Sequence, residues 1–135
     1  LRSADRHVWA TVEELVREAV EDLTAPYGIR AELEYTQGVP PVVNDADCAE
    51  LAAEAVRRVL GEDAVGTADQ SSGGEDFAWY TEEIPGVYLR YGVWDGTSAE
   101  TDLHHPGFML DESALEPGAR LFDAFARLDR GVGEY

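Results

Sequence analysis

The stretch DRHVWATVEELVREAVEDLTAPYGIRAELEY, from Asp5 to Tyr35, decides the fold class because its hydrophobic period changes partway along. Up to Tyr27, apolar residues recur at three- and four-residue intervals, the spacing of one helix face. Gly28 is a helix stop, and Ile29 to Tyr35 then alternates strictly between apolar and polar residues. Such alternation is typical of a half-buried strand in an antiparallel sheet, so the sequence predicts helices combined with a sheet.

The rest of the chain continues this mixed pattern. Glycine and proline at residues 38–41 break the alternation and mark a candidate domain boundary. Beyond it the sequence predicts a helix over Ala46–Leu60, a compact strand over Val87–Tyr91 and a helix over Pro117–Leu128. A capped turn is predicted before the last helix, at Asp111 to Leu115. The last helix carries an apolar stripe made of Leu121, Phe122, Phe125 and Leu128.

The charge of the chain is strongly one-sided. Ten Arg, no Lys and 28 Asp plus Glu give a formal net charge of −18. Phosphate backbones and anionic membranes are bound through clustered Lys and Arg, so we expect no nucleic acid and no membrane as a partner. The carboxylates are scattered along this acidic protein, which favours a solubility adaptation, for example to high salt, over one cation-attracting site.

Other features indicate the compartment. No stretch approaches the roughly 20 apolar residues that span a bilayer, and the opening residues do not resemble a signal peptide. Cys48 is the single cysteine, as expected in a reducing compartment, so the sequence predicts a soluble cytoplasmic protein. Because Leu1 is not methionine and the chain opens on what resembles a strand end, we also expect an N-terminal truncation.

One candidate site is the segment SGGEDF, from Ser72 to Phe77. Its paired glycines, Gly73 and Gly74, let a backbone approach a ligand closely, and the carboxylates of Glu75 and Asp76 follow directly. A flexible turn followed by acidic residues at a helix start explains the same pattern, so both interpretations stay open.

The other candidate site is His104-His105-Pro106, in a loop from Gly92 to Phe108 that is too long for a simple turn. Adjacent side chains rarely reach one metal together, so one histidine would be a ligand and the other would face solvent or a supporting partner. On the residues alone, two ordinary loop histidines are the favoured interpretation. A catalytic zinc needs about three protein ligands, more than this chain offers.

Taken in order, three segments carry a resemblance to a known family: GVPPVVND at 38–45, GGEDF at 73–77 and LHHPGF at 103–108, followed by DESAL at 111–115. Each is weak alone, but their order and spacing closely resemble the metal-dependent amidohydrolases, a peptidase-like family of hydrolases that includes aminoacylases, hippurate hydrolases, N-acyl-amino-acid hydrolases and plant auxin-conjugate hydrolases. The resemblance covers essentially the whole chain.

The resemblance implies an α/β fold in which a mixed-sheet catalytic domain is interrupted by a smaller α+β lid, or dimerisation, domain. Residues 1–40 resemble the end of the lid, a helix plus a strand, through which a homo-oligomer could form. Residues 41–135 resemble the C-terminal portion of the catalytic domain.

The resemblance also assigns site residues. His104 matches the metal-binding histidine of the family's Leu-His-Ser-Pro segment, and His105 stands where the family has Ser, which leaves His105 as the alternative ligand. Gly73, Gly74 and Glu75 match a substrate-facing loop. The complete family site holds two divalent ions, zinc, manganese or cobalt, which polarise the carbonyl and activate water for a glutamate base. That base and the other ligands lie in an N-terminal portion with no counterpart here, so no catalytic residue is assigned.

Two functions are therefore compared. The first is a partial amidohydrolase chain that cleaves N-acyl amino acids or related small substrates, inactive without its missing N-terminal portion. The second is a non-catalytic binding or dimerisation module built on the same fold. The coding region upstream of Leu1 distinguishes them, because the enzyme needs the missing Cys, His and Glu residues there.

Overall fold

The structure, a computed structural model, describes residues 2–129, which form two units. The first unit runs to Asn44 and includes Gln70–Gly86, and the second contains Asp45–Asp69 and the chain from Val87 onward. The first break lies just beyond the predicted boundary at residues 40–41, but no sequence pattern predicts the return of Gln70–Gly86 to the first unit. The assignment of residues 1–40 and 41–135 to lid and catalytic domains stays a prediction, and Leu1 and residues 130–135 lie outside the described residues.

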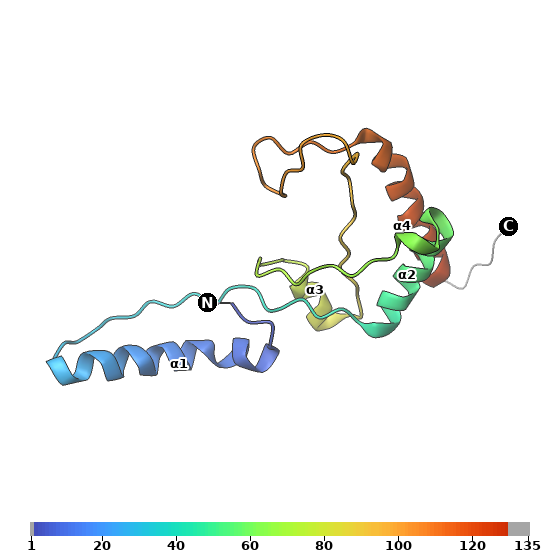
Figure 1. Ribbon diagram of the computed structural model, residues 1–135. Coiled ribbons are helices and arrows are strands. Elements are labelled where there is room, and N and C mark those ends of the chain that lie inside the picture. The colour runs from blue at the N-terminus through green and yellow to red at the C-terminus, as the bar shows by residue number, and fades with distance from the viewer. Residues whose placement is uncertain (1, 130–135) are drawn as a thin grey trace. The chain divides into compact units, whose positions relative to one another are not determined.

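Helix α1, Arg6–Thr24, is the main element of the first unit (Figure 1). It begins after Asp5, whose carboxylate accepts the backbone N–H groups of His7 at 2.7 Å and Val8 at 3.1 Å. The bonds from Val8 and then His7 lower the pKa of Asp5. A short 3-10 helix, Ala25–Tyr27, follows, and Gly28 ends it in the left-handed region at φ 63°. The predicted helix over Asp5 to Tyr27 is confirmed.

The segment after α1 runs back beside the helix in an extended course (Figure 1). Arg17 of α1 donates from Nη1 to the carbonyl of Leu33 at 3.3 Å. A strand needs a neighbouring strand for its N–H and C=O groups. Within residues 2–129 no strand is formed, either here or at Val87–Tyr91. The predicted strands, and with them the mixed sheet and the lid sheet, therefore stay predictions.

Helices α2, Ala46–Leu60, and α4, Leu115–Asp129, pack together in the second unit (Figure 1). Their contact buries Ala52 and Ala55 of α2 completely and leaves Leu121 of α4 only 6% exposed. The small alanines let the two helices approach closely. Both predicted helices are confirmed, although α4 begins two residues earlier than Pro117.

The predicted stripe on α4 is wrong at one position. Phe122 is 75% exposed, whereas its neighbour Leu121 is buried. Consecutive helical residues point about 100° apart, since a turn holds 3.6 residues. The alanine face of α2 therefore covers one of the two side chains and leaves the other uncovered.

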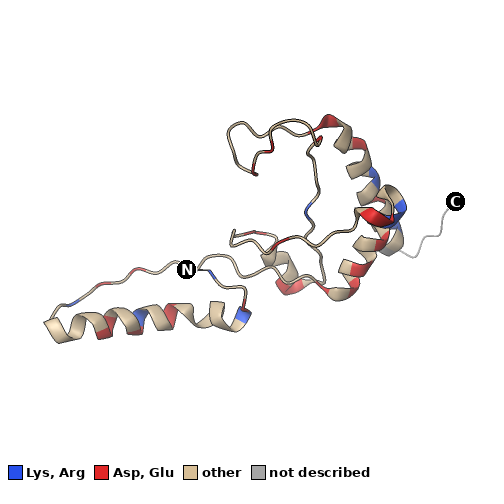
Figure 2. Cartoon of the chain, in the orientation of Figure 1, with Lys and Arg blue, Asp and Glu red and all other residues tan. Residues whose placement is uncertain are grey.

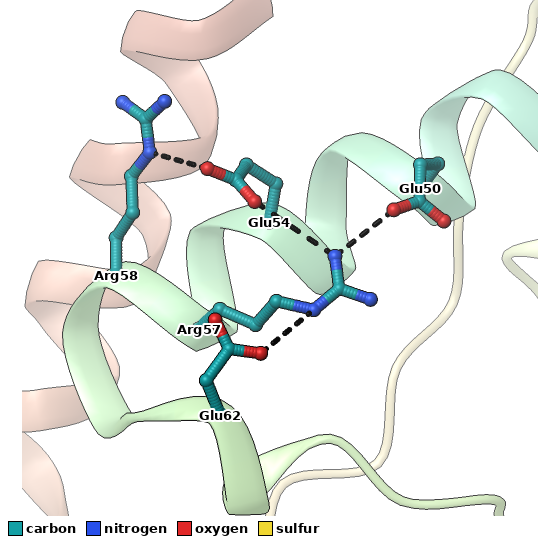
Figure 3. Close-up of polar contacts among 5 residues, drawn as sticks. All are labelled: Glu50, Glu54, Arg57, Arg58 and Glu62. Atoms are coloured by element: carbon teal, nitrogen blue, oxygen red, sulfur yellow. Dashed lines mark hydrogen bonds and ion pairs between the residues drawn. The ribbon is translucent and has the colours of Figure 1, made fainter.

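Acidic residues are distributed over the helices and loops of both units (Figure 2). The clearest charge compensation surrounds the C-terminal turn of α2, where Arg57 contacts Glu50 at 2.9 Å, Glu54 at 3.8 Å and Glu62 at 3.7 Å (Figure 3). The hydrogen bond from Arg57 to Glu50 is the main cause that raises the pKa of Arg57. Arg57 also lies in the last helical turn, where the helix dipole favours a cation. Surface ion pairs are individually weak, so this network offsets local repulsion rather than holding the fold.

Three short elements complete the described chain. They are the 3-10 helix Glu62–Ala64, helix α3, Ala78–Glu83, and the 3-10 helix Glu112–Ala114. Asp111 caps the last of these by accepting from the Ser113 amide at 2.9 Å, as the predicted capped turn requires. Across residues 2–129, none of the helices is both long and apolar enough to cross a membrane.

Candidate functional site

The segment Ser72–Asp76, here called the glycine loop, precedes α3 in the first unit. A Cβ atom added to Gly74 would lie 3.1 Å from Cγ2 of Val39, which is tighter than ordinary van der Waals contact. The Gly73 N–H donates to the Ser71 hydroxyl at 3.0 Å. A side chain at position 74 would therefore press on the Val39 side chain, so glycine suits this packing.

The two carboxylates of the glycine loop differ in their surroundings. Glu75 is half-buried, and its Oε1 accepts the backbone N–H of Phe77 at 3.2 Å. Asp76 is exposed. Helical hydrogen bonding begins at once, since the amides of Ala78 and Trp79 donate to the carbonyls of Glu75 and Asp76. Glu75 thus stands at the start of a helical turn with one oxygen engaged, and the substrate-binding role of the loop stays a prediction.

Arg2 lies against this loop, which no sequence pattern indicates. Its Nη1 donates to the carbonyl of Ser72 at 2.6 Å and lies 3.6 Å from the position of a Cβ on Gly74. The two residues are far apart in the sequence, so only the fold brings them together. A guanidinium has five donors, so one bond to a carbonyl leaves others for a second acceptor.

The histidine pair lies in a sequence of tight turns in the second unit. His105 donates its backbone N–H to the carbonyl of Asp102 at 3.0 Å, and Phe108 donates to the carbonyl of His105 at 2.9 Å. His104 has a φ of 72°, in the left-handed region that few residues other than glycine adopt.

The hydrogen bonds distinguish the two histidines. The Gly107 N–H donates to Nδ1 of His105 at 3.0 Å. An Nδ1 that accepts a bond carries no proton, so the neutral His105 ring holds its proton on Nε2 and has no free lone pair for a metal. The His104 side chain is exposed, and within residues 2–129 its ring makes no hydrogen bond. His104 therefore keeps a nitrogen available for a ligand.

Contacts with the 3-10 helix Glu112–Ala114 and with α4 hold the chain on both sides of the loop Gly92–Phe108, here called the histidine loop. The Asp111 N–H donates to the carbonyl of Val93 at 2.8 Å, which closes the loop between them. The Tyr91 hydroxyl donates to the carbonyl of Ala114 at 3.0 Å. Its ring lies so close to Gly118 that an added Cβ would be 3.2 Å from Cε1, so a larger residue at position 118 would displace the tyrosine.

A second turn orders the middle of the histidine loop. Asp95 accepts the backbone N–H groups of Ser98 and Thr97, both at 2.8 Å, and the Ser98 hydroxyl at 2.9 Å. These bonds, led by the one from the Ser98 amide, lower the pKa of Asp95 to about 2. The indole N–H of Trp94 donates to the carbonyl of Ser98 at 3.0 Å.

The described residues do not fit a complete metal site. Among residues 2–129, no group of three or more His, Cys, Asp or Glu side chains is arranged to hold a metal ion. A catalytic zinc needs about three protein ligands. His104 belongs to the second unit, whereas Glu75 and Asp76 belong to the first.

Residues 3–128 match the family described as Peptidase family M20/M25/M40. The match covers nearly all of the described chain, and the chain belongs to this family. It confirms the resemblance drawn from the segments at 38–45, 73–77 and 103–108, because all three lie within the matched residues. No solved structure gives a significant match.

Several curated proteins are similar over almost the whole chain. They include "Putative glutamate--cysteine ligase 2-3" of Rhodococcus jostii, which is 54% identical over 98% of this chain. N-acetylcysteine deacetylase of Bacillus subtilis is 40% identical over 93% of the chain, and IAA-amino acid hydrolase ILR1-like 2 of Arabidopsis thaliana is 29% identical over 85%. The chain spans only 17%, 32% and 27% of the length of these three proteins, respectively.

Proposed function

We propose that this chain supplies the C-terminal part of a metal-dependent amidohydrolase that cleaves the amide bond of N-acyl amino acids. The family match over residues 3–128 carries this proposal. It is supported by relatives named as a deacetylase and as an amino acid hydrolase. Within this function, His104 is one ligand of a dinuclear site whose other ligands and general base come from the remainder of the protein.

The choice of His104 over His105 rests on hydrogen bonding. Nδ1 of His105 is engaged by the Gly107 amide, so metal binding by His105 would require a change of tautomer and the loss of that bond. His104 loses nothing comparable on binding a metal. The His105 ring instead maintains the turn that presents its neighbour.

Arg2 is proposed to bind the substrate carboxylate. An N-acyl amino acid is an anion, and a chain with a formal net charge of −18 repels anions at long range. A local cation must offset this repulsion, and the Arg2 guanidinium lies beside the glycine loop at Ser72 and Gly74. Arginine is well suited, since its planar fork can meet both oxygens of a carboxylate.

The amino acid that we propose is cysteine. Two Bacillus subtilis relatives are named as deacetylases of N-acetylcysteine or N-acetyl-L-cysteine, and the Rhodococcus jostii relative carries the name of a glutamate–cysteine ligase. Hydrolysis of an N-acyl cysteine releases free cysteine, and a glutamate–cysteine ligation is a reaction class that consumes it. The proposed hydrolase would then precede such a ligation.

The test uses the complete protein that contains this chain. It is incubated with N-acetyl-L-cysteine or N-acetyl-L-alanine and added zinc, manganese or cobalt, and the released amine is measured. We expect turnover with a preference for the cysteine substrate. His104→Ala should lower the rate by at least about 10²-fold, as expected for loss of a metal ligand, whereas His7→Ala, a change of an exposed residue on α1, should not.

His105→Ala separates the two neighbouring ligand candidates. It should keep activity within about tenfold of the wild type, because it removes only the ring that accepts the Gly107 bond. Full activity of His104→Ala together with an inactive His105→Ala would reverse the ligand assignment. Absence of turnover by the complete wild-type protein on both substrates, with each metal, would refute the function.

A non-catalytic binding or dimerisation module is the second candidate. Three apolar side chains of α1 favour it, since Val8, Leu15 and Leu23 are 46%, 55% and 71% exposed. Exposed apolar side chains on one element are typical of surfaces that contact another protein segment. A start codon close to Leu1 and a stable dimer of the 135-residue chain would support this function over the enzyme.

A further inference from the structure

Three segments that are distant in sequence meet at the N-terminal end of α1. The segments are residues 2–9, residues 37–39 and the run from Ser72 to Glu82, all within the first unit. They join residues of the predicted lid to residues of the predicted catalytic portion. The glycine loop forms the first part of the third segment, directly before α3. Contacts that hold this segment at α1 therefore also restrain the loop.

Trp9 is the centre of this arrangement. Its indole N–H donates to the carbonyl of Gly38 at 3.2 Å, and its own carbonyl accepts the side-chain amide of Gln37 at 3.1 Å. Its ring meets Trp79 of α3 edge to face, with centroids 6.1 Å apart and planes at 76°. This geometry is the favoured one for aromatic pairs, so the Trp9–Trp79 contact links α3 to α1 through their side chains.

Arg6 connects the same two helices a second time. Its guanidinium carbon lies 4.4 Å from the centre of the Trp9 ring, and the same group forms an ion pair with Glu82 of α3. A single partly exposed ion pair contributes little by itself. Combined with the cation–π contact and the tryptophan pair, it restrains α3 at two points on one face.

The glycine loop is therefore restrained at both ends. Arg2 holds the carbonyl of Ser72 before the glycines, and α3 begins directly after the loop. Between these points, Gly74 lies close to the Val39 side chain, whose Cγ2 would be 3.1 Å from an added Cβ. A shift of α3 would move the loop backbone, because so few residues separate the loop from the helix.

We propose that Arg6 and Trp9 are positioning residues that hold α3 and thereby set the geometry of the substrate-facing glycine loop. This role rests on the proposed hydrolase function. It concerns two residues, Arg6 and Trp9, that have no role in the proposed hydrolysis itself. Neither side chain needs to touch the substrate. Their effect passes through Trp79 and Glu82 to the loop.

The experiment uses the complete protein with Arg6→Gln and Trp9→Leu. Arg17→Gln is the matched control, because Arg17 lies on the same helix and forms its ion pair with Glu13 of α1 rather than with α3. Hydrogen exchange of the amides in residues 71–77 is measured with and without substrate, together with kcat and KM. Circular dichroism confirms that each variant is folded.

We expect the amides of residues 71–77 to exchange at least about fivefold faster in Arg6→Gln and Trp9→Leu. KM should rise about tenfold with kcat changed less than about threefold, since a misplaced binding loop weakens substrate binding in general. Arg6→Lys keeps the cation over Trp9 and should restore most of the loss. Arg17→Gln should change neither measurement.

Unchanged exchange in both test variants would overturn the proposal, as would faster exchange with wild-type KM. If Trp9→Leu does not fold, the comparison of Arg6→Gln with Arg6→Lys is sufficient to test the proposed positioning role. The exchange measurement needs no turnover. An inactive wild-type protein would therefore count against the proposed hydrolase function, while the restraint on the loop would still be tested.

Discussion

Replacing Leu121 or Phe122 by alanine gives a direct test of how α4 packs. The two residues are adjacent and both belong to the apolar stripe predicted from the sequence, yet Leu121 is 6% exposed and Phe122 is 75% exposed. If the stripe as a whole faced the core, the larger phenylalanine would contribute more. The structure predicts the opposite order.

The magnitudes follow from burial. A buried Leu→Ala change typically costs about 2–5 kcal/mol. The lower half of that range, about 2–3 kcal/mol, is expected for Leu121 because two neighbouring helices can partly close the space. Complete burial of a phenylalanine is worth about 2–3 kcal/mol. Only a quarter of Phe122 is covered, so Phe122→Ala should cost about 0.5 kcal/mol.

Urea unfolding of the 135-residue chain, followed by circular dichroism at 222 nm, distinguishes these values. With a slope of about 1–2 kcal/mol per molar urea, Leu121→Ala should lower the midpoint by at least about 1 M and Phe122→Ala by less than about 0.5 M. If Phe122→Ala destabilises the chain as much as Leu121→Ala or more, then Leu121 is not the main residue that packs α4 against α2.

Three further predictions follow from the loops and the incomplete site. Gly74→Ala should destabilise the chain by about 1 kcal/mol in thermal unfolding, since its Cβ would press on Val39; Gly66→Ala, which has open space around it, is the control. The pKa of Asp95 is lowered to about 2 from 3.8, so its contribution to stability is present above about pH 4 and lost as the pH falls through 2. Trp94 fluorescence should report that loss in the wild type, and Asp95→Asn should remove this pH dependence. Finally, the 135-residue chain alone should not hydrolyse N-acyl amino acids with added zinc, manganese or cobalt, because loss of a positioned general base alone lowers rates by about 10²–10⁴-fold; turnover by the chain that survives His104→Ala would contradict this.

The sequence by itself predicted the three long helices, although α4 begins two residues earlier than expected. Asp5, Asp45 and Asp111 cap the elements that follow them, and Gly28 and Gly61 end helical segments at φ 63° and 98°. These signals act between residues a few positions apart, so they can be read without knowledge of the fold. The order of the three short motifs likewise sufficed for the family, because spacing along the chain is itself a property of the sequence.

Tertiary structure alone decided which residues surround the glycine loop and which face of α4 is covered. Arg2 reaches Ser72, and Trp9 meets Trp79, across about seventy positions of sequence, a separation over which no local periodicity carries information. The apolar pattern of α4 likewise did not reveal that Leu121 is buried and Phe122 is exposed. Hydrophobic periodicity indicates which face of a helix is apolar, but not how much of that face the neighbouring helix covers. Nor could adjacency in the sequence separate His104 from His105, since that distinction arises from a turn that brings the Gly107 amide to one ring and leaves the other exposed.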